Sequence, residues 1–215
     1  MQEIISALPW FYKGLLITLE VSVYAIILGF VLGTLVSLLR LVDFYPLQML
    51  IRVYISFIRG TPILIQIFVV FYALPRFGLD LPAFWAGILA LSLNSAAFIA
   101  EIIRGGMNMI PKGQVEAAYA LGMPKYMVVK RILLPQIFKI ILPQLTNEFI
   151  SIIKTTPILS VITIVELTRV GQQIVGRTYQ PVGVYLFIAA VYLVLNVTIY
   201  LSMKYLETRV ASNRL

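Results

Sequence analysis

Long apolar stretches divide this 215-residue chain, and short polar segments separate them. A helix needs about 20 apolar residues to cross the hydrocarbon core of a bilayer, which is about 30 Å thick. Backbone groups in lipid must be satisfied within the protein, and no ten-residue alternating pattern supports a barrel. The pattern therefore predicts an all-α membrane protein with five transmembrane helices, at about residues 14–39, 53–74, 84–103, 140–165 (interrupted) and 182–206.

Small residues recur at helical spacing in two of these stretches. Gly29 and Gly33 lie four residues apart in the first stretch. Ala96, Ala97 and Ala100 give one side of the third stretch only small side chains. Small side chains let helix backbones approach closely in a membrane. We therefore expect close helix contact at these positions.

The composition excludes most soluble functions. Sixty per cent of the residues are hydrophobic and 12% are charged, which leaves too little polar surface for a water-soluble enzyme. The chain has no Cys and no His, which removes thiol nucleophiles, Cys/His zinc sites and histidine-based acid–base chemistry. The net charge of +8 does not form the exposed stripe that nucleic acid requires, because the basic residues lie at the ends of apolar runs. We expect no nucleic-acid partner and no metal site.

The basic residues predict the orientation in the membrane. With five spans the termini face opposite sides, and Lys and Arg concentrate on the cytoplasmic side. This predicts an N-terminus outside, a C-terminus inside and a long cytoplasmic loop at 104–139. One side holds few basic residues: Lys13, Arg76, Arg169 and Arg177. The other holds many: Arg40, Arg52, Arg104, Lys112, Lys125, Lys130, Arg131, Lys139, Lys204, Arg209 and Arg214.

The 104–139 loop has the pattern of a compact two-helix element. Helical stretches are expected near 114–121 and 125–133, with Gly122 at the C′ position of the first and Pro124 near N1 of the second. Such a hairpin is either a docking surface that points into the cytoplasm or an amphipathic hairpin that lies on the membrane. The pattern alone leaves both alternatives open.

One motif in this loop resembles a known family. Glu116, Ala117, Ala118 and Gly122, followed by Ile132 and the pair Leu134-Pro135, match the EAA signature of permease subunits in binding-protein-dependent ABC importers. Three further segments resemble the polar amino-acid uptake branch: 59–62 (RGTP), 94–106 (NSAAFIAEIIRGG) and 154–157 (KTTP).

The resemblance implies a single transmembrane domain over 1–215, with 104–139 as the coupling loop. Glu116, Ala117, Ala118 and Gly122 would then be the coupling residues, seated in a cleft of the ATPase subunit. The residue types suit that role. Small alanines allow close approach, Gly122 allows a sharp turn, and Glu116 offers a carboxylate to a basic partner.

The implied function is ATP-driven import of polar amino acids, such as arginine, lysine, histidine or glutamine, across the cell membrane. We favour the basic ones, because a neutral side chain would not need so many acids at membrane depth. The implied partners are two ATPase subunits, an extracytoplasmic binding protein and a second permease subunit. Five helices are few for a gated path, so we favour a homodimer. The sequence lacks a Gly-x-x-x-x-Gly-Lys-Ser/Thr loop, so ATP and Mg²⁺ are expected on the partner, and this chain is expected to be no enzyme and to bind no cofactor.

A parallel internal repeat points to a substrate site. Residues 59–70 (RGTPILIQIFVV) and 154–165 (KTTPILSVITIV) both place Thr-Pro-Ile-Leu shortly after a base. Proline interruptions at corresponding positions of two spans indicate a binding site, since each break exposes the N-terminus of a half-helix. We expect Thr61 and Thr156 as N-caps that help receive a substrate carboxylate. The alternative is a pair of proline kinks that only shape the bundle.

Polar residues at membrane depth supply the other candidates, because such residues are costly and often functional. Lys154, with Thr155 and Thr156, is expected to bind the substrate carboxylate. Glu148, Glu101 or Asn94 is expected to bind its amine. The whole predicted substrate set is Glu20, Thr61, Asn94, Ser95, Glu101, Glu148, Lys154, Thr155 and Thr156.

Each acidic candidate also has a structural alternative. Glu148 and Lys154 can neutralise each other, and Glu101 can pair with Arg104 on one helical face. Glu20 is assigned to a cationic substrate side chain, or else is solvated from outside. Arg59 is interpreted as an anchor rather than a ligand.

Two rival functions explain part of the pattern. A secondary transporter driven by an ion gradient accounts for the intramembrane acids, and a membrane assembly factor accounts for the spans. Neither accounts for the EAA spacing, and the internal repeat is parallel rather than inverted.

Overall fold

A computed structural model describes residues 2–212, and helices make up the regular structure of that part of the chain. The elements are α1 (Gln2–Leu39), α2 (Tyr45–Gly60), α3 (Ile63–Phe68), α4 (Ala83–Asn108), α5 (Lys112–Ala120), α6 (Lys125–Val128), α7 (Leu134–Thr155), α8 (Leu167–Thr178) and α9 (Pro181–Ser212). A π-helical turn, Val69–Ala73, and a 3-10 turn, Leu74–Phe77, extend α3. A π-helical turn, Val129–Leu133, joins α6 to α7, and a 3-10 segment, Thr156–Ile162, follows α7.

Three described helices are long and apolar enough to cross a membrane: α1, α4 and α9. Two further pairs qualify only as broken spans. The chain bends by 115° between α2 and the segment that begins at Ile63, and by 52° between the α6–α7 segment and α8. The described part therefore has three to five spans. The break that the internal repeat predicts within 53–74 is present, because the chain turns at Pro62, and 53–74 as one membrane span stays a prediction.

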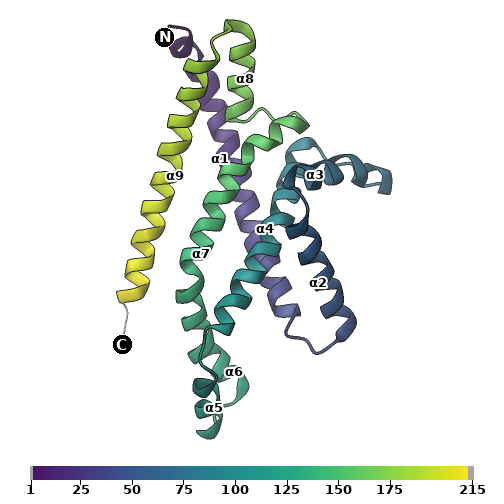
Figure 1. Cartoon of the computed structure of the whole chain (residues 1–215), viewed down its shortest axis with the longest axis vertical. Coiled ribbons are helices and arrows are strands. Elements are labelled where there is room, and N and C mark those ends of the chain that lie inside the picture. Colours follow the sequence, from purple (N-terminus) through teal and green to yellow (C-terminus); the bar gives the residue numbers. More distant parts are fainter. Residues whose placement is uncertain (1, 213–215) are drawn as a thin grey trace.

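The start of α1 and the α5–α6 hairpin lie at opposite ends of the molecule. The N-terminal end of α1 lies at one end together with α8, and the α5–α6 hairpin lies at the other (Figure 1). Helix α9 runs from the α8 end toward the hairpin end. This arrangement agrees with the predicted opposition of the termini, and the cytoplasmic assignment of the hairpin end stays a prediction from the charge pattern.

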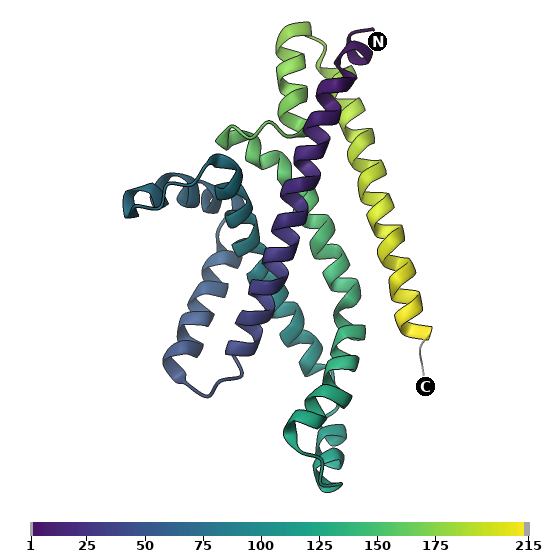
Figure 2. The ribbon, with the colours of Figure 1, turned by 180° about the vertical axis from the view of Figure 1, so that it is seen from behind.

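Helix α1 packs closely along α4, as Figure 2 shows for the long N-terminal helix. A Cβ atom added to Gly29 would lie 3.0 Å from the Cβ of Ser95. One added to Gly33 would lie 2.8 Å from the Cβ of Ile99 and 2.9 Å from the carbonyl oxygen of Ala96. The close contact predicted from the small residues is confirmed.

The buried core follows this contact from one end of the molecule to the other. A central cluster joins α1, α3, α4 and the 3-10 segment through Val21, Ile67, Ile88, Leu159 and Ile162. A second cluster joins α1, α8 and α9 near the N-terminal end, and a third joins α4 to α7 near the hairpin. The bundle is thus continuous from α8 to the hairpin.

The α1–α4 contact generates a stability prediction. Gly33→Leu inserts a side chain where Ile99 and Ala96 already touch the backbone. Overpacking of this kind costs about 1–3 kcal/mol, so the melting temperature of the detergent-purified protein should fall.

The matched control is Gly105→Leu, because nothing lies within 4 Å of a Cβ added at Gly105. It should leave the melting temperature nearly unchanged. An equal loss in both variants would contradict the close α1–α4 contact.

Candidate functional site

The α5–α6 hairpin turns at Gly122, as the sequence predicts. Gly122 has φ +76°, a left-handed conformation that favours glycine. Its N–H donates to the carbonyl of Tyr119 (2.9 Å), and the N–H of Met123 donates to the carbonyl of Ala118 (3.1 Å). These two bonds form a Schellman motif that ends α5. Pro124 is the N-cap of α6, one position before the predicted N1.

The predicted coupling residues divide between the surface and the interior of the hairpin. Glu116 and Ala117 are exposed, whereas Ala118 is only 3% exposed. Leu121 is 83% and Tyr126 68% exposed, so the tip of the hairpin presents apolar side chains at its surface. A protein that bound this face of the hairpin would contact Ala117, whereas Ala118 packs inside the hairpin.

Polar and apolar contacts tie the hairpin to the helices above it. The Nε2 of Gln136 on α7 donates to the Oε1 of Gln114 on α5 (2.8 Å). Ile110 and Leu133, at the two ends of the hairpin, pack in one apolar cluster with Ile103 of α4 and Ile137 of α7, and a cavity of about 370 Å³ lies beside this contact. The hairpin is thus linked to two long helices at its base.

A buried glutamine completes the bend between α2 and α3. Pro62 has no N–H to give to the carbonyl of Ile58, four residues earlier. The Nε2 of Gln66 donates to that carbonyl (2.8 Å) and also contacts the carbonyl and hydroxyl oxygens of Thr61 (both 3.0 Å). Asn94 on α4 in turn donates to the Oε1 of Gln66 (2.9 Å). The network links Thr61 and Asn94, two predicted site residues, through Gln66, which sequence reasoning missed.

The predicted N-cap role of Thr61 was wrong. Thr61 is the C-cap of α2, its hydroxyl donates to the carbonyl of Phe57 (2.7 Å), and Pro62 takes the N-cap position of α3. A proline disfavours the helical conformation at the residue before it. Thr61 is therefore extended (φ −120°, ψ 146°) and ends the preceding helix.

The prediction of a half-helix start at Thr156 was also wrong. Helix α7 continues through Thr155 into the 3-10 segment, and the break comes later, at Thr163 (φ +71°). The missing N–H of Pro157 would have bonded the carbonyl of Ile153. The backbone N–H of Thr156 and its hydroxyl (2.8 Å) both donate to that carbonyl instead, and the chain continues past Pro157 in the 3-10 segment.

Glu101 lies at the centre of an arginine cluster. Its carboxylate is 2.5 Å from Arg40, 2.7 Å from Arg104 and 3.4 Å from Arg59. The predicted pairing of Glu101 with Arg104 is confirmed, and two more guanidinium groups join it from the ends of α1 and α2. A substrate role for Glu101 stays a prediction.

Glu148 and Lys154 lie in the same helix but do not meet. Six residues separate them on α7, which corresponds to about 9 Å along the axis and about 120° around it. Neither forms an ion pair with the other among the residues that the structure describes, so they do not neutralise each other. Glu148 is half-buried beside the Ser95 hydroxyl of α4, and Lys154 is exposed on the side that faces α9.

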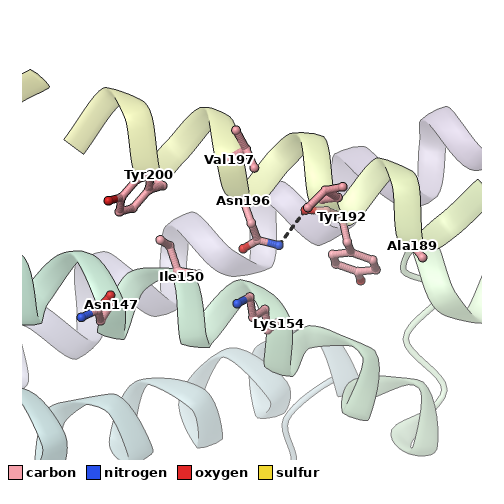
Figure 3. A pocket seen from close by; sticks show the side chains of 9 residues that line it. Asn147, Ile150, Lys154, Ala189, Tyr192, Asn196, Val197 and Tyr200 are labelled. Atoms are coloured by element: carbon pink, nitrogen blue, oxygen red, sulfur yellow. Dashed lines mark hydrogen bonds between the residues drawn. The ribbon is translucent and has the colours of Figure 1, made fainter. Parts of the chain in front are cut away.

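A cavity of about 600 Å³ lies between α7 and α9 (Figure 3). Glu20 lies outside its lining, exposed on α1, and the hydroxyl of Thr155 donates to the carbonyl of Ser151 (2.8 Å). The cavity thus offers one ammonium group and several neutral polar groups to a ligand. Its lining includes Asn147, Ile150, Lys154, Tyr192, Asn196 and Tyr200.

A buried acid that sequence reasoning missed lies next to this cavity. Glu166 is fully buried and caps α8, because its carboxyl oxygens accept the N–H groups of Thr168 (2.9 Å) and Arg169 (2.7 Å). Tyr192 also donates to it (3.1 Å). The available signal was a lone acid at the end of an apolar stretch, but Glu is not among the usual N-cap residues.

Comparison with known proteins identifies the family. Residues 25–212 match the family described as "Binding-protein-dependent transport system inner membrane component". The chain belongs to this family. It is 39% identical to the arginine transport system permease protein ArtQ of Bacillus subtilis, over 97% of this chain and 96% of that protein. It is also 39% identical to the probable glutamine ABC transporter permease protein GlnM of the same organism, over 93% of this chain and 92% of that one.

A solved structure agrees with this membership. The chain is similar to a structure of an amino acid ABC transporter with histidines, with a TM-score of 0.90, 38% identity and 96% coverage of both chains. The permease is therefore a membrane subunit of an amino acid ABC importer. Its relatives carry different substrate names, which leaves the amino acid to be inferred from the site.

The arginine cluster generates a second prediction. Glu101→Gln removes the negative charge between three guanidinium groups, whose side chains are 27–49% exposed. The loss of charge-assisted hydrogen bonds in this partly solvated site should cost roughly 1–3 kcal/mol. The melting temperature of the purified permease should fall, and less so at high salt.

Glu116→Gln is the control, since Glu116 is exposed on the hairpin. If both variants melt at the wild-type temperature, Glu101 does not hold α1, α2 and α4 together.

Proposed function

We propose that this permease imports polar, basic amino acids, with arginine, lysine or histidine as substrates and glutamine as a further possibility. The observation that carries the proposal is the arrangement of Lys154 and Glu148 on α7. Lys154 offers a cation and Glu148 offers a carboxyl group, and the two do not form an ion pair with each other among the described residues. A zwitterion with a cationic side chain needs both kinds of partner.

The spacing on α7 favours a long substrate. Lys154 and Glu148 lie about 9 Å apart along α7 and about 120° apart around it, so Lys154 faces α9 and Glu148 faces Ser95 of α4. A substrate that contacts both must pass around one side of α7, and it must be longer than the distance between the α-amine and the carboxylate of one amino acid. We assign the substrate carboxylate to Lys154 and a cationic group to Glu148, with Thr155 and Thr156 near the first and Ser95 near the second.

Three predicted residues have subsidiary places in this proposal. Asn94 and Thr61 support the site through Gln66 rather than as free ligands, because their polar groups are already bonded in that network. Glu20 lies outside the cavity lining, so its contribution to binding a cationic side chain needs its own test.

The hairpin is assigned to coupling. Glu116, Ala117 and Gly122, with the exposed Leu121, would contact an ATPase subunit, and Ala118 would support the hairpin from inside. The proposed complex has two ATPase subunits, an extracytoplasmic binding protein and two copies of this permease. ATP and Mg²⁺ would bind to the ATPase subunits, and this chain would act as one transmembrane domain over 1–215 with no cofactor of its own.

This assembly suggests a mechanism. Closure of the ATPase dimer on ATP would draw the two hairpins together, and Gln114–Gln136 and the packing at the hairpin base would pass that movement to α4 and α7. The site on α7 would then open outward to the binding protein. ATP hydrolysis would reset the complex.

Substitutions on α7 test the substrate assignment. Lys154→Gln should raise KM for arginine and glutamine alike, because both carry a carboxylate. Glu148→Gln should raise KM for arginine more than for glutamine. Loss of one charge-assisted bond is worth about 1.5–3 kcal/mol, or about 10- to 150-fold in affinity.

The measurement is uptake by the reconstituted complex with both amino acids. Glu20→Gln serves as a comparison on another helix, α1; neither Glu20 nor Glu148 is in the cavity lining. Unchanged arginine uptake in both Glu148→Gln and Glu20→Gln would remove the basis for a basic substrate.

A second test concerns coupling. Gly122→Val places a β-branched residue at φ +76°, where it strains the turn although no atom lies within 4 Å. The hairpin should lose its rigid shape, so ATP hydrolysis should continue while uptake per ATP falls several-fold.

Gly113→Val is the matched control, since Gly113 lies in the same hairpin without a positive φ and with open space around its Cα. Normal coupled uptake in Gly122→Val would count against the coupling role of this turn.

A further inference from the structure

The buried carboxyl group of Glu166 has contacts on two sides. Toward α8 it accepts hydrogen bonds from the N–H groups of Thr168 and Arg169, the second and third residues of that helix. Toward α9 it accepts the hydroxyl of Tyr192 at 3.1 Å. No basic side chain contacts it among the contacts that the structure describes, so hydrogen bonds to neutral groups hold the carboxyl group in place.

Tyr192 is the point where several elements meet. Its hydroxyl oxygen lies 3.3 Å from that of Thr156, next to the predicted carboxylate site, and accepts from Thr168 at 3.5 Å. Its ring lines the α7–α9 cavity close to Lys154 and Ala189 (Figure 3). The Tyr192 side chain forms part of one cavity wall. Its orientation therefore depends on Glu166, which accepts the hydrogen bond of its hydroxyl.

Helix α8 connects this network to the N-terminal end of the molecule. The N–H of Leu167 donates to the hydroxyl of buried Thr18 on α1 (3.1 Å), and the apolar face of α8 packs against α1 and α9. A shift of α8 would move the Glu166 carboxyl group, and with it the partner of Tyr192.

We propose that Glu166 is a positioning residue that holds Tyr192 against the cavity through the Glu166–Tyr192 hydrogen bond, and so links the position of α8 to the shape of the substrate site. The expected effect on substrate binding rests on the proposed function. The effect on the position of Tyr192 rests only on hydrogen bonds within this chain.

The chain contains no cysteine, so a single introduced cysteine is the sole maleimide target on the permease subunit, and its label is read on that subunit after separation from the ATPase. Ala189→Cys places the probe on the exposed cavity wall near Tyr192. In the permease–ATPase complex, Glu166→Gln and Tyr192→Phe should each raise the rate of maleimide modification several-fold, because each breaks the same hydrogen bond.

Glu207→Gln is the matched control. Glu207 is likewise an acid that forms a side-chain hydrogen bond between elements, since it lies on α9 and accepts from Thr146 of α7 (2.9 Å), but it does not line the cavity. It should leave the modification rate unchanged. Wild-type rates in both Glu166→Gln and Tyr192→Phe would overturn the inference, and so would an equal rise in Glu207→Gln.

Arginine binding to the same complex supplies a second readout. Glu166→Gln and Tyr192→Phe should each weaken binding by about tenfold, the value of one hydrogen bond, and the double variant should be no weaker than either single one. Multiplying effects in the double variant would overturn the positioning role. If the wild-type complex bound no arginine, the substrate proposal would fail, while the modification rates would still decide the inference.

Discussion

The structure depends on how two prolines are accommodated inside apolar helices. Each removes one backbone donor, and a carbonyl left without a partner in lipid costs several kcal/mol. Gln66 gives its amide to the carbonyl of Ile58, and Thr156 gives its hydroxyl to the carbonyl of Ile153. One Thr-Pro sequence therefore produces two shapes. The first bends by 115°, and its substitute donor lies four residues beyond the proline. The second runs on into the 3-10 segment, and its substitute donor is the residue just before the proline.

These two shapes position the polar groups of the site. The bend after α2 brings Gln66 to Asn94 on α4, beside Ser95 and the half-buried Glu148 of α7. The unbroken passage at Pro157 keeps Lys154 on a regular helix, facing α9 across the cavity. The later break at Thr163 then allows Glu166 to cap α8 and reach Tyr192. The proposed substrate site, the hairpin and α8 thus lie on one continuous set of helices.

Features set by local pattern were predictable from the sequence. Apolar length indicated α1, α4 and α9, small residues indicated the α1–α4 contact, and Gly122 indicated the turn of the hairpin. Features set by distant partners were not. Gln66 and Glu166 each sit in or beside an apolar run, and their roles appear only when the prolines or α9 lie next to them. The burial of Ala118 likewise depends on how α5 packs, which the motif does not encode.

The most direct test of the account is uptake of labelled arginine into vesicles that contain this permease with its ATPase subunit, in the presence of the binding protein. Uptake should require ATP and should persist when an ionophore collapses the membrane potential. Uptake that continues without ATP and stops when the potential is collapsed would contradict the account and favour an ion-driven transporter.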